Sequence, residues 1–268
     1  MSNFELIIYP PASPIAFNLF GFPVRFYGII IALALFIGYF SVSKFLEKKY
    51  DKNDANKFVD YSLYLVLISI IGARLFYVLG SFAFYRNNPL EIFMINHGGI
   101  SIWGGILLGI VGLYVLSKIF KFSFYIHSAV ISVFMPLCQA IGRWGNYFNQ
   151  EAFGAPSDFI VKLFVSESYR PSQYVQFEYF HPAFLYESIL DLAIFIVLLS
   201  SFKKANPAKT FYLYIILYSL VRIAVEAIRI DSILNLSKIH IATIIAILAM
   251  IAGIVGLILS LKKPRDGA

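Results

Sequence analysis

Hydrophobic residues along this chain gather in seven long runs separated by short polar stretches. Each run approaches the length of about 20 residues that an α-helix needs to cross the hydrocarbon core of a bilayer. The pattern therefore predicts an all-α membrane protein with seven transmembrane helices. The expected spans cover residues 24–44, 61–81, 98–118, 126–147, 182–202, 209–228 and 240–261.

The longest stretch outside these spans, residues 150–180, mixes charged and aromatic side chains. Alternation of apolar and polar positions in residues 160–165 predicts a short strand or an interfacial segment there. We expect a small extracytoplasmic cap between the fourth and fifth helices, above a site that opens outward. Since no internal repeat divides the chain, residues 1–268 are expected to form a single integral-membrane domain.

Composition supports the membrane assignment. Hydrophobic residues make up 59% of the chain and charged residues 14%, against about 45–50% and about 25% in soluble domains. A soluble globule of this size could not bury so much apolar surface, so lipid must solvate much of it. The lone Cys138 excludes an internal disulfide framework and a cysteine-rich metal site.

The net charge of +7 is unevenly placed, and its placement predicts the orientation. Short loops rich in Lys and Arg stay in the cytoplasm. One face carries thirteen basic residues, namely Lys44, Lys48, Lys49, Lys52, Lys57, Lys118, Lys121, Lys203, Lys204, Lys209, Lys262, Lys263 and Arg265. The opposite face carries five, namely Arg86, Lys162, Arg170, Arg229 and Lys238. We therefore expect the N-terminus outside, the C-terminus in the cytoplasm, and no nucleic-acid partner.

The four remaining basic residues are arginines in or at the ends of spans. Charged residues are costly in lipid, normally face the protein interior, and mark functional sites by default. For Arg25, snorkelling of the side chain to the membrane surface is an equally good interpretation. The four are Arg25, Arg74, Arg143 and Arg222.

The densest polar motif is Gly-Arg-Trp-Gly-Asn-Tyr-Phe-Asn-Gln-Glu-Ala-Phe-Gly at residues 142–154, at the outer end of the fourth span. Arg143 and Asn146 are three residues apart and share a helical face, with Asn149 one turn further on. The planar guanidinium fork suits a phosphate, and Asn can bind phosphate or glycerol hydroxyls. The alternative is a helix end with surface polar residues, which the density of polar groups at a membrane boundary disfavours.

Two further motifs place charge inside spans. Tyr218, Arg222 and Glu226 follow one another at intervals of four, so they lie on one helical face, and the Glu can neutralise and orient the Arg. A purely structural buried ion pair is the alternative, although such pairs stabilise poorly. Glu187, inside the fifth span, also needs a partner, and an intramembrane arginine is the obvious one.

Residues 96–105 open the third span with two glycine pairs, which allow close approach of a helix, a loop or a lipid headgroup. His97 in this segment could act as a base, although a lone interfacial histidine is usually just solvated. His127 and His240 are isolated and are interpreted as structural. Four scattered histidines and one cysteine offer no metal-ligand spacing, so we expect no metal.

Together these motifs resemble the bacterial phosphatidylglycerol–prolipoprotein diacylglyceryl transferases over nearly the whole chain. The expected fold also fits that family. The matching segments are Phe26-Tyr27-Gly28, Gly72-Ala73-Arg74, the double glycine run of the third span, residues 142–154, residues 181–187, and the face of Tyr218, Arg222 and Glu226.

The resemblance implies transfer of the diacylglyceryl group from phosphatidylglycerol to the lipobox cysteine of a preprolipoprotein signal peptide. The reaction forms a thioether and releases glycerol phosphate. The resemblance also implies that no cofactor is needed. It places the protein in the bacterial cytoplasmic membrane, in contact with membrane lipid.

Motifs and resemblance together assign two sets of site residues. The arginines are expected to hold the headgroup phosphate and stabilise the charge that develops as the C–O bond breaks. Catalytic roles are expected for Arg143, Arg222, Tyr27, Glu151 and His97. Substrate-binding roles are expected for Arg143, Asn146, Asn149, Gly154, Tyr218, Arg222, Glu226 and Gly104.

One departure from the family concerns the base. Many members carry His where this chain has Trp103, and an indole cannot accept a proton. Either the base lies elsewhere, with His97, Tyr27 and Glu151 as candidates, or none is strictly needed. A thiol of pKa about 8.5 is already a few per cent thiolate at neutral pH. The family also often has Gly-Gln near the start of the seventh span, where this chain has Ile239-His240.

Two other functions fit less well. A small transporter would also place Arg and Glu inside the membrane, but it favours polar residues through the whole membrane thickness and repeated halves. The polar motifs here gather at the outer ends of spans. An intramembrane hydrolase would need a Ser–His or paired-Asp arrangement, which the spans do not contain.

Overall fold

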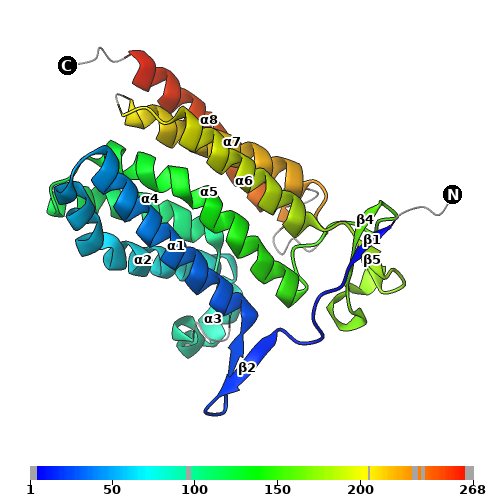
Figure 1. Cartoon of the computed structure of the whole chain (residues 1–268). Coiled ribbons are helices and arrows are strands. Elements are labelled where there is room, and N and C mark those ends of the chain that lie inside the picture. Colours follow the sequence, from blue (N-terminus) through cyan, green and yellow to red (C-terminus); the bar gives the residue numbers. More distant parts are fainter. Residues whose placement is uncertain (1–4, 95–97, 205, 231–234, 237–238, 263–268) are drawn as a thin grey trace. The chain divides into compact units, whose positions relative to one another are not determined.

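The computed structural model describes residues 5–94, 98–204, 206–230, 235–236 and 239–262. Within them, seven helices are long and apolar enough to cross a membrane, which confirms the predicted number. They are α1 (Phe26–Lys49), α2 (Lys52–Gly80), α4 (Ile102–Ile119), α5 (Phe124–Asn149), α6 (Ala183–Ser201), α7 (Pro207–Glu226) and α8 (Ile241–Lys262) (Figure 1).

The first two helices extend well beyond their apolar runs. Asp51 caps α2, and its carboxylate accepts a hydrogen bond from the backbone N–H of Asp54 at 2.7 Å. The lysine-rich segment expected as a loop is therefore mostly helical, and only residues 50 and 51 connect α1 to α2. Lys and Glu are good helix formers, so these helices continue past the apolar residues.

Short elements connect the helices. The strand predicted within residues 160–165 is confirmed as β4. The three N-terminal strands, β1 to β3, were not predicted. The short elements of the described residues are β1 (Leu6–Ile8), β2 (Ile15–Leu19), β3 (Phe22–Arg25), α3 (Phe82–Asn87), η1 (Pro89–Phe93), β4 (Val161–Phe164), η3 (Glu167–Tyr169), η4 (Ser172–Tyr174), β5 (Tyr179–Phe180), β6 (Asn235–Leu236) and β7 (Ile239–His240).

The cap is a three-stranded sheet in the order β1-β4-β5. β1 runs parallel to β4, with Leu6 opposite Val161, and β5 pairs antiparallel on the other side. Lys162 Nζ lies 2.8 Å from Glu5 Oε2, and this hydrogen bond raises the pKa of Lys162 above its ordinary value. The N-terminal segment is thereby part of the cap.

The second sheet is the hairpin β2–β3, which leads directly into α1. Phe20 and Gly21 at its tip both have positive φ, 50° and 86°. A two-residue hairpin loop with positive φ at both positions matches the right-handed twist of the flanking strands.

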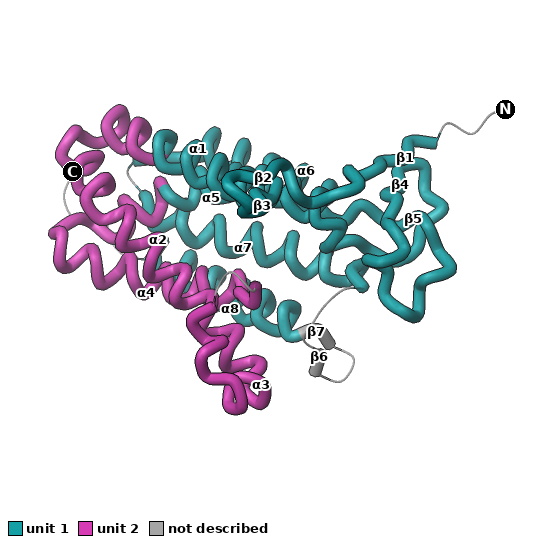
Figure 2. Tube along the Cα trace, turned by 90° about the horizontal axis from the view of Figure 1, so that it is seen from below, with its two compact units in different colours: residues 1–41, 131–268 teal, residues 42–130 magenta. Residues whose placement is uncertain are grey.

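The chain forms two compact units (Figure 2). Unit 1 comprises residues 1–41 and 131–268, and unit 2 comprises residues 42–130. In unit 1, α7 packs against both α6 and α8; in unit 2, α2 packs along α4. Large apolar side chains such as Leu248 and Leu259 of α8 stay exposed, as lipid-facing residues should.

Candidate active site

In unit 1, the C-terminal ends of α5 and α7 meet the N-terminal end of α6. The Gly154 N–H donates to the His181 carbonyl at 2.8 Å, and the Ala155 N–H donates to the Ile228 carbonyl at 2.9 Å. A Cβ at Gly154 would lie 2.8 Å from His181 Cβ, closer than real contacts allow, so this position requires glycine. These bonds bring three polar segments, far apart in sequence, to one place.

Glu187 lies between two arginines at this meeting point. Arg143 Nη2 is 2.6 Å from Glu187 Oε1, and Arg222 Nη1 donates to both carboxylate oxygens at 2.9 and 3.0 Å. Arg222 Nη2 also donates to Glu226 Oε2 at 2.6 Å. The predicted Arg222–Glu226 pair is confirmed, and so is the expectation that Glu187 pairs with an intramembrane arginine; it pairs with two.

The two guanidinium groups retain donors for a further partner. Arg143 Nε and Arg222 Nε are buried without a hydrogen-bond partner among the described residues. The Arg143 side chain is 16% exposed, whereas that of Arg222 is 6% exposed. Since a buried ion pair stabilises little by itself, these remaining donors fit a site for an anion such as a phosphate.

A line of polar side chains continues from the arginines toward the middle of the helices. Arg143 Nη2 donates to Tyr218 Oη at 3.4 Å. The Tyr218 ring stacks on Tyr214, with ring centroids 5.8 Å apart. Tyr214 Oη then donates to Gln139 Oε1 at 3.3 Å. The predicted binding residue Tyr218 is therefore in contact with the arginine cluster.

Tyr27 of α1 packs against α5. A Cβ at Gly145 would lie 2.6 Å from Tyr27 Cδ2, so the tyrosine ring occupies the space that this glycine leaves. The Tyr27 phenol interacts electrostatically with both Glu151 and Arg143. The structure therefore places Tyr27 within electrostatic range of Arg143, and its catalytic role stays a prediction.

The two asparagines of the 142–154 motif converge on Glu151. Asn146 Nδ2 and Asn149 Nδ2 donate to Glu151 Oε1 at 2.9 and 3.2 Å. Gln150, with φ of 52°, ends α5 in the left-handed region and turns the chain so that Glu151 faces back to the helix. Arg25, Asn149 and Glu151 line part of a cavity of about 350 Å³.

The remaining predicted site residues lie in segment 95–105. His97 is outside the described residues. Gly104 lies where α4 crosses α2 in unit 2, and a Cβ there would meet the Gly72 carbonyl. Close helix packing alone accounts for this glycine, so its substrate-binding role stays a prediction. Trp103 is buried in the same unit.

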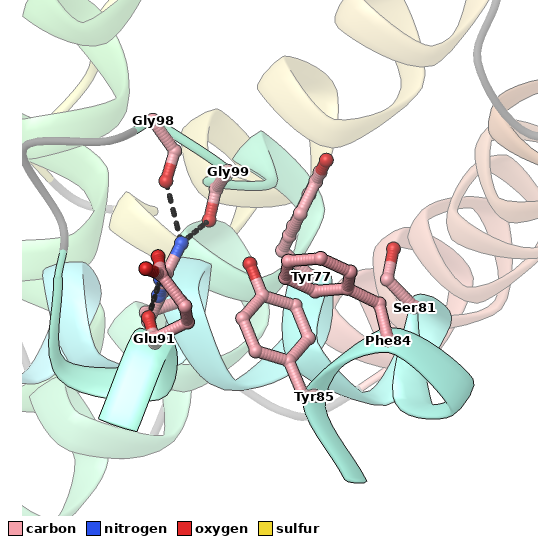
Figure 3. Close-up of a pocket in the computed structure, with 8 residues that line it drawn as sticks. Tyr77, Ser81, Phe84, Tyr85, Glu91, Gly98 and Gly99 are labelled. Carbon is pink, nitrogen blue, oxygen red and sulfur yellow. Dashed lines mark hydrogen bonds between the residues drawn. The ribbon is translucent and has the colours of Figure 1, made fainter. Parts of the chain in front are cut away.

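Arg74 of α2, which the sequence marked as a functional candidate, binds backbone. Its guanidinium donates to the Gly98 and Gly99 carbonyls at 2.5 and 2.7 Å and to the Glu91 carbonyl (Figure 3). It also donates to the Ile92 carbonyl at 2.9 Å and to the Met94 carbonyl. Both glycines have positive φ. Arg74 therefore holds together the segment that precedes α4, beside a cavity of about 360 Å³.

His127, which the sequence analysis interprets as structural, is buried and contacts two polar side chains. Its Nδ1 is 2.9 Å from Tyr61 Oη, and its Nε2 is 3.4 Å from Asp54 Oδ1, all within unit 2. Among the described residues, no group of three or more His, Cys, Asp or Glu could hold a metal ion.

The sequence analysis missed two polar residues of this region: Gln139, which accepts from Tyr214, and Asp191, which interacts electrostatically with both arginines. The signal for Asp191 was present, because it follows Glu187 by four residues in an otherwise apolar span. The two carboxyl groups therefore share a helical face.

Seven apolar helices and a buried arginine–carboxylate cluster define the chain as a multi-pass membrane protein with a charged site among its helices. Residues 14–259 match the family of prolipoprotein diacylglyceryl transferases. The chain belongs to this family, as its motifs suggested.

Similar proteins include the phosphatidylglycerol--prolipoprotein diacylglyceryl transferase of Staphylococcus aureus strain MSSA476. It is 37% identical over 250 residues, which cover 92% of this chain and 89% of the relative. The protein of the same name from strain JH9 is 36% identical with the same coverage. These matches favour a transferase over the transporter considered from the sequence.

Proposed function

We propose that this protein transfers the diacylglyceryl group of phosphatidylglycerol to the cysteine thiol of a prolipoprotein, forming a thioether and releasing glycerol phosphate. The names of the relatives state both substrates. The observation in this chain that carries the proposal is the Glu187 carboxylate shared by Arg143 and Arg222. It holds two guanidinium groups together among apolar helices, where a lipid phosphodiester can reach them.

In the proposed reaction, Arg143 and Arg222 bind the headgroup phosphate. The thiol sulfur attacks the glyceryl carbon, the C–O bond breaks, and its electron pair leaves on the phosphate oxygen. Donors already aimed at the developing charge lower the barrier, because they need not reorganise during the reaction. Glu187 and Glu226 orient the guanidinium planes, and Tyr218 supports Arg143.

The other predicted residues have supporting roles in this proposal. Glu151, held by Asn146 and Asn149, borders the cavity that takes the glycerol hydroxyls or the peptide. The hydrogen bond from the Gly154 N–H to the His181 carbonyl connects the end of the 142–154 motif to the start of α6. Tyr27 borders the reacting groups. His97 keeps the role expected from the sequence, that of a candidate base. Gly104 keeps its expected role as a position that a lipid headgroup can approach closely.

The finer features of the proposal concern partners and placement. The protein substrate is a signal peptide with a lipobox, and no cofactor or nucleic acid takes part. The chain works as one domain in the bacterial cytoplasmic membrane, with its N-terminus outside. The excess of basic residues in the loops on the opposite face supports this orientation.

The test is a reconstituted transfer reaction. Purified protein in phosphatidylglycerol vesicles is incubated with a lipobox peptide, and mass spectrometry follows the diacylglyceryl thioether while an enzymatic assay follows glycerol phosphate. We expect both products, and neither with a peptide whose cysteine is replaced by serine. Absence of the thioether when the protein is correctly folded would refute the proposed function.

Arginine variants test the phosphate site in the same assay. Removing one such donor costs about 10²–10³ in kcat, so we expect a loss of at least that size for Arg143→Ala. Arg222→Lys should also lose activity, because Lys keeps the charge but not the planar fork. Arg86→Ala, at an exposed position of α3, is the control. Near-normal lipidation by both site variants would exclude the arginine clamp.

A further inference from the structure

Asp191 of α6 is completely buried, with 0% of its surface exposed. Neither of its carboxyl oxygens has a hydrogen-bond partner within the part of the chain that the structure describes. A buried carboxyl without a partner costs a substantial amount of free energy. A catalytic role, in which a substrate supplies the missing donor, is one explanation for such a group.

The surroundings of Asp191 are those of the arginine site. The two arginines direct their closest contacts to Glu187 and Glu226, and Asp191 forms no ion pair with a described residue within 4 Å. It is therefore not one of the structural counter-ions. The ionisable groups that act on it electrostatically come from α5, α6 and α7, and they are Arg143, Glu187, Tyr214, Tyr218 and Arg222.

The position of Asp191 along α6 suits the geometry of the transfer. It follows Glu187 by four residues, which is about 6 Å along a helix, on the side away from the end where α6 begins. In a displacement at a saturated carbon, the nucleophile and the leaving group lie on opposite sides of that carbon. With the phosphate at the arginines, the attacking thiol belongs on the side away from them, toward Asp191.

We propose that Asp191 accepts the proton of the substrate thiol, an inference that rests on the proposed transferase function. As sulfur forms the C–S bond, the S–H proton passes to a carboxylate oxygen of Asp191. The C–O bond breaks, and its electron pair leaves on the phosphate oxygen. Asp191 then releases the proton to water and the departing glycerol phosphate takes one up, so no other reactant is consumed. This step supplies the base that the Trp103 indole cannot.

The variant Asp191→Asn tests this role, because it keeps size and polarity but cannot accept the proton. We expect kcat to fall about 10²–10⁴-fold at neutral pH, the usual contribution of a general base, with KM for phosphatidylglycerol unchanged. The loss should shrink as the pH approaches the thiol pKa of about 8.5. Asp60→Asn, at an exposed position of α2, is the matched control and should match wild type.

A lipobox peptide with selenocysteine in place of cysteine separates chemistry from structure. Its selenol is ionised at neutral pH and needs no base, so Asp191→Asn should regain most of its lost rate with this peptide. Should Asp191→Asn not accumulate as folded protein, Asp191→Glu carries the test. It should slow the cysteine peptide much more than the selenocysteine peptide.

Two results would overturn the inference. One is an Asp191→Asn enzyme with wild-type kcat on the cysteine peptide, which would leave the base to Tyr27, Glu151 or His97. The other is an equal loss with both peptides at every pH, which would assign Asp191 a purely structural role. If wild-type protein makes no thioether at all, the proposed function fails before Asp191 is tested.

Discussion

At the scale of single residues, the site is organised around Glu187. This carboxylate is 1% exposed and is the common partner of Arg143 and Arg222. Its two oxygens neutralise guanidinium groups from two different helices. The site therefore depends on Glu187 for its assembly as well as for its charge balance.

We expect Glu187→Gln to destabilise the protein. Removing one partner of a buried ion pair costs about 3–5 kcal/mol, because the remaining charge stays buried without compensation. The thermal unfolding midpoint in detergent should fall clearly below that of wild type. Glu178→Gln, at an exposed position in the cap, should leave it unchanged. Equal midpoints for both variants would show that the arginines do not rely on Glu187.

At the scale of elements, the contact of α1 with α5 positions Tyr27. Gly145→Ala would place a Cβ 2.6 Å from the tyrosine ring, whereas Gly142→Ala on the same helix would place one 3.5 Å from Ile31 Cδ1, an ordinary contact. We therefore expect Gly145→Ala to lower the transfer rate and Gly142→Ala to retain it. Equal rates would mean that the position of Tyr27 is unimportant.

The crossing of α2 and α4 depends on Gly104 in a different way. A Cβ on Gly104 would overlap the Gly72 carbonyl and Phe76 Cβ, and overpacking of this kind costs about 1–3 kcal/mol. Gly28→Ala in α1 has no atom within 4 Å of the new Cβ, and it should be neutral or slightly stabilising. Thermal unfolding of both variants checks this; an unaffected Gly104→Ala would show that the helices can separate freely.

At the scale of the whole molecule, the placement of basic residues predicts the orientation in the membrane. In a Cys138→Ala background, we expect Ser172→Cys in the cap to react with a membrane-impermeant maleimide in intact cells. Lys48→Cys, near the end of α1, should react only after permeabilisation. The reverse pattern of labelling would invert the predicted topology.

The sequence by itself determined the features that depend on neighbouring residues. Mean hydropathy over a window is a local property, so all seven helices were predictable to within a few residues, apart from the polar extensions of α1 and α2. The Arg222–Glu226 pair was predictable for the same reason, because residues four apart in a helix face the same side. The strand β4 was predictable from alternation over a few residues.

Only the tertiary structure decided which distant side chains meet. Parallel pairing of β1 with β4 and the sharing of Glu187 by two arginines join segments far apart in sequence. Such contacts depend on how each helix is rotated about its axis, and apolar composition does not specify that rotation. For the same reason, the sequence marked Arg74 of α2 as a candidate for the site, whereas in the fold its guanidinium binds backbone carbonyls of the segment before α4.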